Sequence, residues 1–249
     1  MLSDLRVHSA GLINSLLRRF GVELKECAKQ PHHNLLGLRN ISFSTVIDVG
    51  ANEGQFVVEF RKFFPDAIFY SFEPLPSCFS VLTKQSGGDR RWQCFNTALG
   101  CENKRADFYF HQNHPSSSSF LADTIRGQSL YPETKGQTIV PVDCVTLDSW
   151  VDSHPNVLKP PVLLKMDVQG YESQVLQGAK QTLTQVNAVI TEVIVESLYN
   201  GQSTFDEQVK LLARAGLVFC GVLRHAFDGD QNVISLDCVF RRHSGNKNF

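Results

Sequence analysis

The strongest chemical signal in the sequence is a turn that contains glycines and carboxylates at the end of an apolar strand. Residues 46–54 read Val-Ile-Asp-Val-Gly-Ala-Asn-Glu-Gly, and a helical pattern follows them. Gly50 and Gly54 permit a tight turn and a close approach of a ligand to the backbone. The helix N-terminus presents free N–H groups that suit a carboxylate or a phosphate. We therefore expect a ligand site at Asp48, Gly50, Asn52 and Gly54.

A second acidic position restricts the class of ligand that could bind at this turn. Glu73 ends the next apolar strand, where a carboxylate can accept hydrogen bonds from the two hydroxyls of a ribose. A dinucleotide site favours Gly-x-Gly-x-x-Gly, whereas Asn52 stands here at the position of the middle glycine. The pattern favours S-adenosylmethionine, which has a free ribose and an amino-acid end. Asp48 could bind its ammonium group, directly or through water.

A second cluster of candidate residues follows a later apolar strand. Residues 164–172 read Leu-Lys-Met-Asp-Val-Gln-Gly-Tyr-Glu. Asp167 closes the strand and is expected beside the reactive end of the cofactor, with Lys165 on the same face. Glu172 opens a helix, where the macrodipole favours a carboxylate, so helix-start chemistry is its alternative explanation. Glu192 lies among apolar residues and needs a partner there, and a salt bridge to Lys165 is its alternative.

The elements that must position these residues alternate between apolar strands and amphipathic helices. This alternation predicts an α/β fold with a parallel sheet covered by helices on both faces. The expected helices span residues 55–64, 77–85, 171–180 and 204–215, and the expected strands span 45–49, 67–72, 92–96, 161–166, 188–195, 217–222 and 233–241. The turn Asp228-Gly229-Asp230 is too short for a parallel crossover, so the last strand should run antiparallel.

Two segments lie outside this alternation. Residues of about 105–145, including the run Ser116 to Ser119, predict an inserted hairpin with loops. Residues 1–42 are expected as an N-terminal helical segment before a domain at 43–249. Within this segment, residues 2–20 are expected to form a helix that packs against the domain; a dimer contact and a position on a membrane surface are the alternatives. Residues 31–40 are expected to connect the N-terminal segment to the domain, with His32 and His33 on the surface. The apolar face of this helix comprises Leu5, Leu12, Ile13, Leu16, Leu17 and Phe20.

Composition excludes several classes of protein. The chain has 24 Lys and Arg against 25 Asp and Glu, so no global basic excess indicates nucleic acid as a partner. Seven cysteines without a Cys-x-x-Cys pair predict free thiols in a reducing compartment. No apolar run reaches the roughly 20 residues of a membrane helix, and the residues after Arg18-Arg19 are too charged for an export signal. We expect a cytoplasmic protein.

The succession of motifs resembles the FkbM family of S-adenosylmethionine-dependent methyltransferases over roughly residues 43–241. It includes Asn96-Thr97-Ala98-Leu99-Gly100 and Val145-Thr146-Leu147-Asp148. The resemblance implies a class I methyltransferase fold, a Rossmann-like, seven-stranded, mostly parallel sheet whose last strand is antiparallel. It also implies methylation of a hydroxyl on a sugar or glycan, or on a polyketide-type natural product. The family usually has Asp-x-Glu-Gly-x-Glu, whereas Gln169 replaces the first glutamate here.

The resemblance also implies roles for single residues. Asp48, Gly50, Asn52 and Gly54 would hold the methionine end and Glu73 the ribose, while the backbone of Ala98 and Leu99 borders the adenine. Facing the acceptor would be Lys165, Asp167, Glu172 and Glu192. Weaker substrate-side candidates are Ser118, Ser119, Tyr199 and His225.

The base that accepts the hydroxyl proton is expected to be Asp167 first, Glu192 second and His225 third. An aspartate at its ordinary pKa is a weak base for an alcohol, so desolvation or a bound cation would have to assist it. Asp167 and Glu192 could hold a divalent ion, although no His or Cys ligand spacing supports one.

Two other classes stay open at this point. A nicotinamide-dependent oxidoreductase would use a similar sheet edge, and a non-catalytic cofactor-binding module would explain Gln169 as the mark of lost chemistry. An RNA methyltransferase is disfavoured by the balanced charge. A small-molecule or glycan acceptor is the expected partner, and a homodimer is an open alternative.

Overall fold

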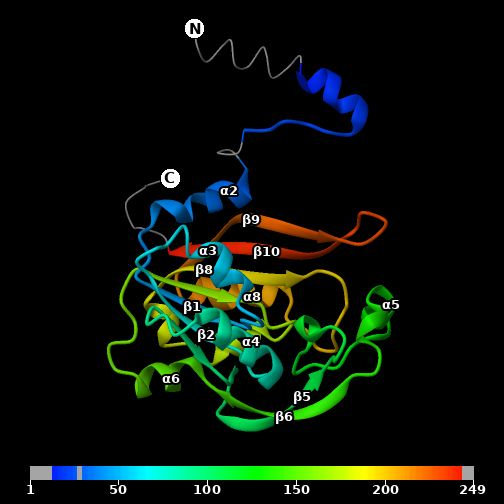
Figure 1. Ribbon diagram of the computed structural model, residues 1–249. Helices are drawn as coiled ribbons and strands as arrows, with labels where there is room; N and C mark the ends of the chain where they lie inside the picture. The colour runs from blue at the N-terminus through cyan, green and yellow to red at the C-terminus, as the bar shows by residue number, and fades with distance from the viewer. Residues whose placement is uncertain (1–12, 27–29, 243–249) are drawn as a thin grey trace.

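The protein is built around a seven-stranded sheet with the order β3-β2-β1-β7-β8-β10-β9 (Figure 1). The structure, a computed structural model, describes residues 13–26 and 30–242. The parallel strands are β1 (Thr45–Val49), β2 (Ile68–Phe72), β3 (Trp92–Phe95), β7 (Val162–Met166) and β8 (Val186–Ile194). The last strand, β10 (Val233–Arg242), pairs antiparallel with both β8 and β9 (Leu217–Phe227). The predicted class I methyltransferase topology is thus confirmed.

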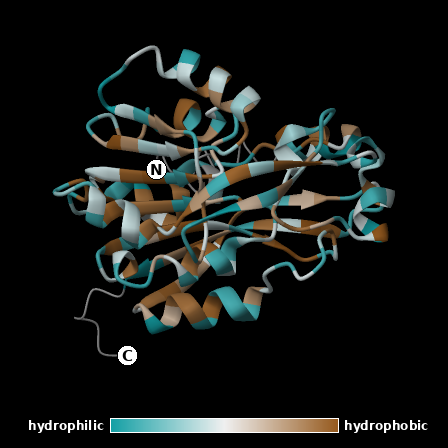
Figure 2. Cartoon of the chain, turned by 90° about the horizontal axis from the view of Figure 1, so that it is seen from below, coloured by the Kyte–Doolittle hydropathy of each residue, from teal (hydrophilic) through white to brown (hydrophobic). Residues whose placement is uncertain are grey.

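Helices cover both faces of this sheet, as the apolar strands predicted. All five residues of β1 are buried, because alternate side chains enter different cores. Ile47 and Val49 pack in a core with α6 (Leu147–Ser153), α7 (Glu172–Gln177) and α8 (Phe205–Arg214). Val46 packs on the opposite face with α3 (Gln55–Phe60) and α4 (Pro76–Ser86). Figure 2 shows hydrophobic residues along the central strands.

Two predicted helices are shorter than expected. Helix α3 ends at Phe60, and Pro65 follows a few residues later, so the chain cannot continue in regular helix. Helix α7 ends at Gly178, where a Cβ atom would lie 1.9 Å from the backbone oxygen of Gly100. The helix therefore stops where the chain passes close to the third-strand loop.

The inserted segment forms a second, three-stranded sheet beside the main one. Strands β5 (Lys104–Phe110) and β6 (Thr138–Val145) pair antiparallel, which confirms the predicted hairpin. Strand β4 (Ala98–Leu99) was not predicted, because two residues are too few to show a periodic pattern. The short helix α5 (Ile125–Leu130) lies in the connection between β5 and β6. This segment forms one wall of the cavities described below.

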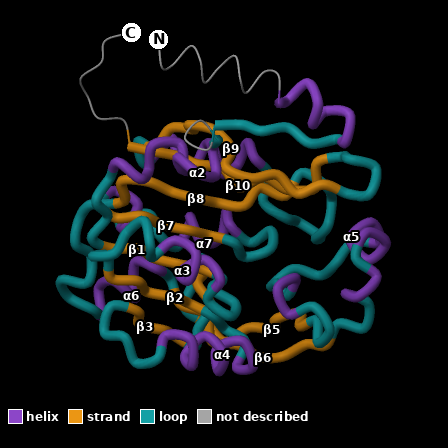
Figure 3. Tube along the Cα trace, turned by 45° about the horizontal axis from the view of Figure 1, so that its top comes forward, coloured by secondary structure: helices purple, strands orange, loops and turns teal. Residues whose placement is uncertain are grey.

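The described N-terminal residues 13–17 are helical, as expected, but packing against the domain is not seen for three members of the predicted apolar face. Ile13, Leu16 and Phe20 are 48%, 60% and 76% exposed. A dimer contact and a membrane-surface position stay predictions. Figure 3 shows this segment apart from the main body. Leu5 and Leu12 lie outside the described residues. By contrast Leu35 and Leu38, beside α2 (Pro31–Asn34), are buried in the domain core.

Within residues 13–26 and 30–242, no helix has the length and apolar character that a membrane span requires. The six cysteines in the described ranges are free thiols, and Cys78, Cys144 and Cys238 are buried.

Candidate functional site

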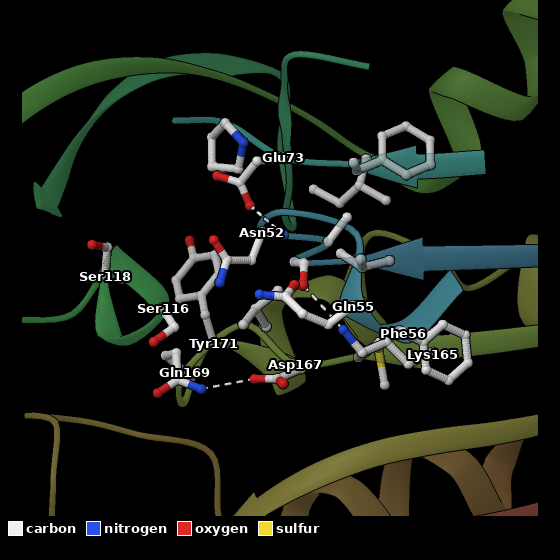
Figure 4. Close-up of a pocket in the computed structure, with 18 of the residues that line it drawn as sticks. Asn52, Gln55, Phe56, Glu73, Ser116, Ser118, Lys165, Asp167, Gln169 and Tyr171 are labelled. Carbon is white, nitrogen blue, oxygen red and sulfur yellow. Dashed lines mark hydrogen bonds between the residues drawn. The ribbon is translucent and has the colours of Figure 1, made fainter. Parts of the chain in front are cut away.

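A cleft of about 320 Å³ opens at the carboxyl ends of β1, β2 and β7 (Figure 4). Its lining includes Gly50 and Asn52 after β1, Glu73 after β2, and Asp167 after β7. Parallel strands bring their carboxyl ends to one edge of a sheet, which is why residues far apart in sequence meet here. The volume lies within the usual range for a ligand site.

Gly50 is required by the contact between two strand ends. Its φ is +72°, and a Cβ atom would lie 1.9 Å from the backbone oxygen of Asp167. Any side chain would therefore push apart the turns that follow β1 and β7. Gly54 serves packing instead: its φ is +96°, and a Cβ atom would lie 2.7 Å from the ring of Trp92.

Glu73 is buried at the edge of the cleft with both carboxylate oxygens held in place. One oxygen accepts a hydrogen bond from the backbone N–H of Asn52 at 2.8 Å (Figure 4). The other accepts one from the backbone N–H of Leu75, also at 2.8 Å. Burial raises the pKa of Glu73 to about 7. A carboxylate has about four acceptor positions, so both oxygens retain capacity for a pair of hydroxyls in the cleft.

The cleft beside Glu73 is apolar. Leu75, Leu99, Phe108 and Phe120 line it, together with Ala98. This composition suits a flat heteroaromatic ring, while Glu73 suits a ribose, so the residues present fit an adenosyl group. The adenine-bordering role that the resemblance implied for Ala98 and Leu99 stays a prediction; both residues line the cleft.

Asp48 lies beneath the cleft rather than in its lining. It is fully buried; its Oδ1 lies 3.1 Å from Lys165 Nζ, and Ser71 Oγ donates to its Oδ2 at 3.3 Å. Lys165 lines the cleft and donates to the backbone oxygen of Gly50 at 3.0 Å. Burial disfavours its ammonium form, but the carboxylates of Asp48 and Asp167 outweigh burial and raise the pKa of Lys165. Asp48 is therefore placed to act through Lys165 and Gly50.

Gln169 joins the two predicted acids. Its Nε2 donates to Asp167 Oδ1 at 2.7 Å and to Glu192 Oε2 at 3.0 Å. Its Oε1 lies 2.9 Å from the hydroxyl of Tyr199, which also lies 2.9 Å from the backbone oxygen of Ser117. Burial, followed by the charges of Asp167 and Glu172, raises the pKa of Glu192 well above its ordinary range. One amide thus separates two carboxylates.

A second cavity of about 210 Å³ lies on the other side of this network. Ser116, Asp167 and Gln169 line both cavities, whereas Glu192 and Tyr199 line only the second. Asp167 therefore faces the cleft and the second cavity together. A molecule bound in each would meet at this carboxylate.

Glu172 lies outside both cavities. It is fully buried, and its Oε1 accepts hydrogen bonds from the backbone N–H groups of Val168 at 3.1 Å and Gly170 at 3.2 Å. Burial raises the pKa of Glu172 to about 7. Its position favours the helix-start explanation: it holds the turn that carries Asp167 and Gln169.

Comparison with known proteins decides the class of this site. The profile of the Methyltransferase FkbM domain matches residues 48–219. The chain belongs to the FkbM methyltransferase family. Membership confirms the resemblance seen in the motifs and favours S-adenosylmethionine over a nicotinamide cofactor.

Two relatives found by sequence are named as methyltransferases. The 2-O-methyltransferase NoeI of Sinorhizobium fredii is 29% identical over 218 residues, which cover 84% of this chain and 89% of NoeI. Methyltransferase 1 of Beauveria bassiana is 30% identical over 54% of this chain and 58% of its own length. Among solved structures, the 1,6-didemethyltoxoflavin-N1-methyltransferase of Burkholderia thailandensis matches with a TM-score of 0.45 and 11% identity, covering 98% of this chain and 88% of that one.

The substrate-side candidates of this FkbM methyltransferase separate in space. Ser118 and Tyr199 line the cavities, and Ser119 donates from its hydroxyl to the backbone oxygen of Gln169 at 2.8 Å. His225 lies exposed on β9, stacked on Phe227, and lines neither cavity. The structure therefore does not bring His225 to Asp167.

Some residues at the FkbM site were missed from the sequence. Asp237 on β10 and Arg224 on β9 line the cleft, and burial raises the pKa of Asp237 to about 6. A charge inside the apolar run of residues 233–240 was the available signal for Asp237. Asp123 lines the second cavity, and its Oδ1 lies 3.3 Å from Nε2 of buried His111. No local sequence pattern predicts this pair. In the described residues, no three His, Cys, Asp or Glu side chains are grouped to hold a metal ion.

Proposed function

We propose that this chain is an S-adenosylmethionine-dependent O-methyltransferase whose acceptor is a hydroxyl of a sugar or glycan, or of a polyketide-type natural product. The observation that carries the proposal is the position of Asp167 at the junction of the two cavities. The similarity to NoeI, a 2-O-methyltransferase, supports a hydroxyl oxygen as the methylated atom.

The adenosyl group would lie in the cleft. Glu73 would hold the ribose hydroxyls, and Ala98 and Leu99 would border the adenine. Gly50 and Asn52 would contact the amino-acid end, with Lys165 as a candidate partner for its carboxylate. S-adenosylmethionine supplies an electrophilic methyl group when bound.

Asp167 would orient the acceptor hydroxyl and accept its proton. The nearby amide of Gln169 donates to Asp167 Oδ1, so Oδ2 is the oxygen left for the hydroxyl. Positioning is the larger requirement, since correct placement of reacting groups contributes several kcal/mol to a displacement. Glu192, with its raised pKa, is the second candidate for the base.

Two measurements test the proposal. Calorimetry should detect binding of S-adenosylhomocysteine to the wild type. The affinity of Glu73→Ala should be lower by a factor of about ten or more, because two charge-assisted hydrogen bonds to the ribose are lost. Transfer of a labelled methyl group to a pool of glycans should be lost in Asp167→Asn with cofactor affinity retained. Unchanged cofactor affinity in Glu73→Ala would contradict the assignment of Glu73 to the ribose. Full activity in Asp167→Asn would eliminate Asp167 as the base. Binding without transfer by the wild type would indicate a non-catalytic module.

A further inference from the structure

The lining of the second cavity contains several carboxyl groups. Asp123, Asp167 and Glu192 contribute carboxyl groups to its lining, whereas no described lining residue is lysine or arginine. The base present is the imidazole of His114, whose Nδ1 is engaged by Ser117 Oγ at 2.7 Å. A bound anion would find no cationic partner among the described residues of this lining.

The rest of the lining combines apolar and hydrogen-bonding groups. Ile194, Leu198 and Ile234 supply aliphatic surface, while Tyr131 and Tyr199 supply aromatic rings with hydroxyls. Carboxylates accept hydrogen bonds from hydroxyl and ammonium groups and cannot donate to a phosphate. A ring that has both C–H faces and several hydroxyls matches this lining.

We propose that the second cavity is the acceptor site and that it selects hydroxylated rings that are neutral or carry an amino group, and rejects rings that carry phosphate or carboxylate. This inference rests on the proposed function, because it takes the compound bound there to be the methyl acceptor. The selection is electrostatic. An added negative charge would lie close to the Asp167 carboxylate in a partly desolvated pocket whose described lining has no lysine or arginine to pair with it, whereas an ammonium group can pair with Asp167.

Three matched probes test the selection: glucose, glucosamine and glucose 6-phosphate, each with excess S-adenosylhomocysteine. Saturation-transfer NMR should show binding of glucose and glucosamine, and glucose 6-phosphate should bind at least about tenfold more weakly than glucosamine. That factor is conservative for a unit charge at roughly 8 Å from a carboxylate at an effective dielectric constant near 20. Equal or stronger binding of glucose 6-phosphate, or no binding of any probe, overturns the proposal.

A blocking substitution tests the location. Ala226 on β9 is exposed and lines the second cavity but not the cleft, so Ala226→Trp should abolish probe binding. Ala226→Leu should weaken it less. The matched control is Val218→Trp, because Val218 is also exposed on β9 and lines neither cavity. Probe binding that survives Ala226→Trp places the sugar elsewhere and overturns the assignment.

Calorimetry on the same samples separates the two proposals. All three variants should bind S-adenosylhomocysteine as the wild type does, which also shows that they are folded. If the wild type fails to bind S-adenosylhomocysteine, the proposed function fails. If it binds but the probes show no selection, only the assignment of the second cavity fails.

Discussion

Gln169 is the residue at which this chain departs from the usual FkbM motif, and the structure gives it a defined position. The sequence alone suggested weakened chemistry, since a glutamate had been replaced. The amide instead donates to Asp167 and Glu192 at once, which a carboxylate at this position could not do while ionised. Gln169 therefore keeps two acids close together without a cation between them.

The charge of residue 169 should control stability at high pH. In Gln169→Glu a third carboxyl joins Asp167 and Glu192, so its pKa in the folded state rises above the unfolded value. The folded state then binds more protons, and the loss of stability grows as the pH rises from 5 to 8. We expect a deficit of roughly 1–3 kcal/mol at pH 8, since one unit of pKa shift corresponds to about 1.4 kcal/mol.

Denaturant unfolding at several pH values measures this effect. Gln169→Met is the control, because it removes the same hydrogen bonds without adding a charge and should show a deficit that changes little with pH. A Gln169→Glu deficit that is constant between pH 5 and 8 would contradict the contact with both acids.

Substitutions of Glu172 distinguish a structural role of this residue from a catalytic role. Its pKa of about 7 in the folded state exceeds the unfolded value of 4.5, so wild-type stability should fall as the pH rises from 4.5 through 7. Glu172→Gln retains an acceptor for Val168 and Gly170 and removes this fall. The thermal midpoint of Glu172→Gln should therefore rise relative to that of the wild type as the pH increases from 5 to 8.

Glu172→Ala should behave differently. It leaves two backbone N–H groups without their acceptor, which costs roughly 2–4 kcal/mol relative to Glu172→Gln at any pH. If Glu172→Gln lost methyl transfer while remaining stable and able to bind cofactor, a direct part in the chemistry would replace the structural role.

At the scale of elements, the site depends on two turns that touch. The turn after β1 meets the turn after β7 at Gly50, and a Cβ atom there would overlap the backbone oxygen of Asp167. Both turns carry residues that line the cleft, so their separation would move Asn52 and Asp167 relative to each other. Under the proposed function, this contact would couple the cofactor end of the site to the acceptor end.

Gly50→Ala should unfold at lower denaturant and lose cofactor affinity. Strain from the positive φ costs about 1 kcal/mol, and the overlap with Asp167 adds roughly 1–3 kcal/mol. Gly88→Ala isolates the first contribution, because Gly88 has a similar φ of +75° and nothing within 4 Å of the added Cβ. Equal losses in the two variants would show that the strand ends do not press on each other.

Elements with a strong pattern were predictable, and those defined by tertiary contact were not. The strands of the main sheet followed from apolar runs, and the hairpin from the change in character after residue 100. Strand β4 depends on its pairing with β6, and the end of α7 depends on the close approach of Gly178 to the backbone of Gly100; no local pattern reveals either contact. The shared edge of Gly50, Glu73 and Asp167 was predictable for the same reason as the strands, since each of these residues follows the end of a strand.

Side-chain orientation could not be predicted in this way. Asp48 and Glu73 both lie near strand ends, yet Asp48 is turned beneath the cleft toward Lys165, and only Glu73 lines it. Glu172 likewise points into its own turn. A sequence gives the edge at which a residue lies, but whether the side chain reaches the ligand depends on which neighbours compete for it.

At the scale of the whole molecule, the first 42 residues divide into two parts. In residues 13–26, Ile13, Leu16 and Phe20 are exposed. In residues 30–42, by contrast, Leu35 and Leu38 are buried in the domain core. Deleting residues 1–26 should therefore change the thermal midpoint by only a few degrees. Deleting residues 1–42 should destabilise the domain by at least about 4 kcal/mol, the loss expected for two buried leucines.

Calorimetric unfolding of the two truncated proteins distinguishes these parts. A large loss on deletion of residues 1–26 would show that the N-terminal segment contributes to the fold through contacts beyond those described. Equal stability of both truncated proteins would instead place the domain boundary after residue 42, as the sequence alone predicted.

We expect the edge formed by β1, β2 and β7 to bind S-adenosylmethionine with its reactive end toward Asp167. A crystal structure with S-adenosylhomocysteine tests it most directly. We expect the ribose hydroxyls to contact the carboxylate of Glu73, the adenine to lie beside Leu99, and the sulfur to lie on the side of the cleft that Asp167 shares with the second cavity. A ligand bound elsewhere, or one whose sulfur points away from Asp167, would contradict it.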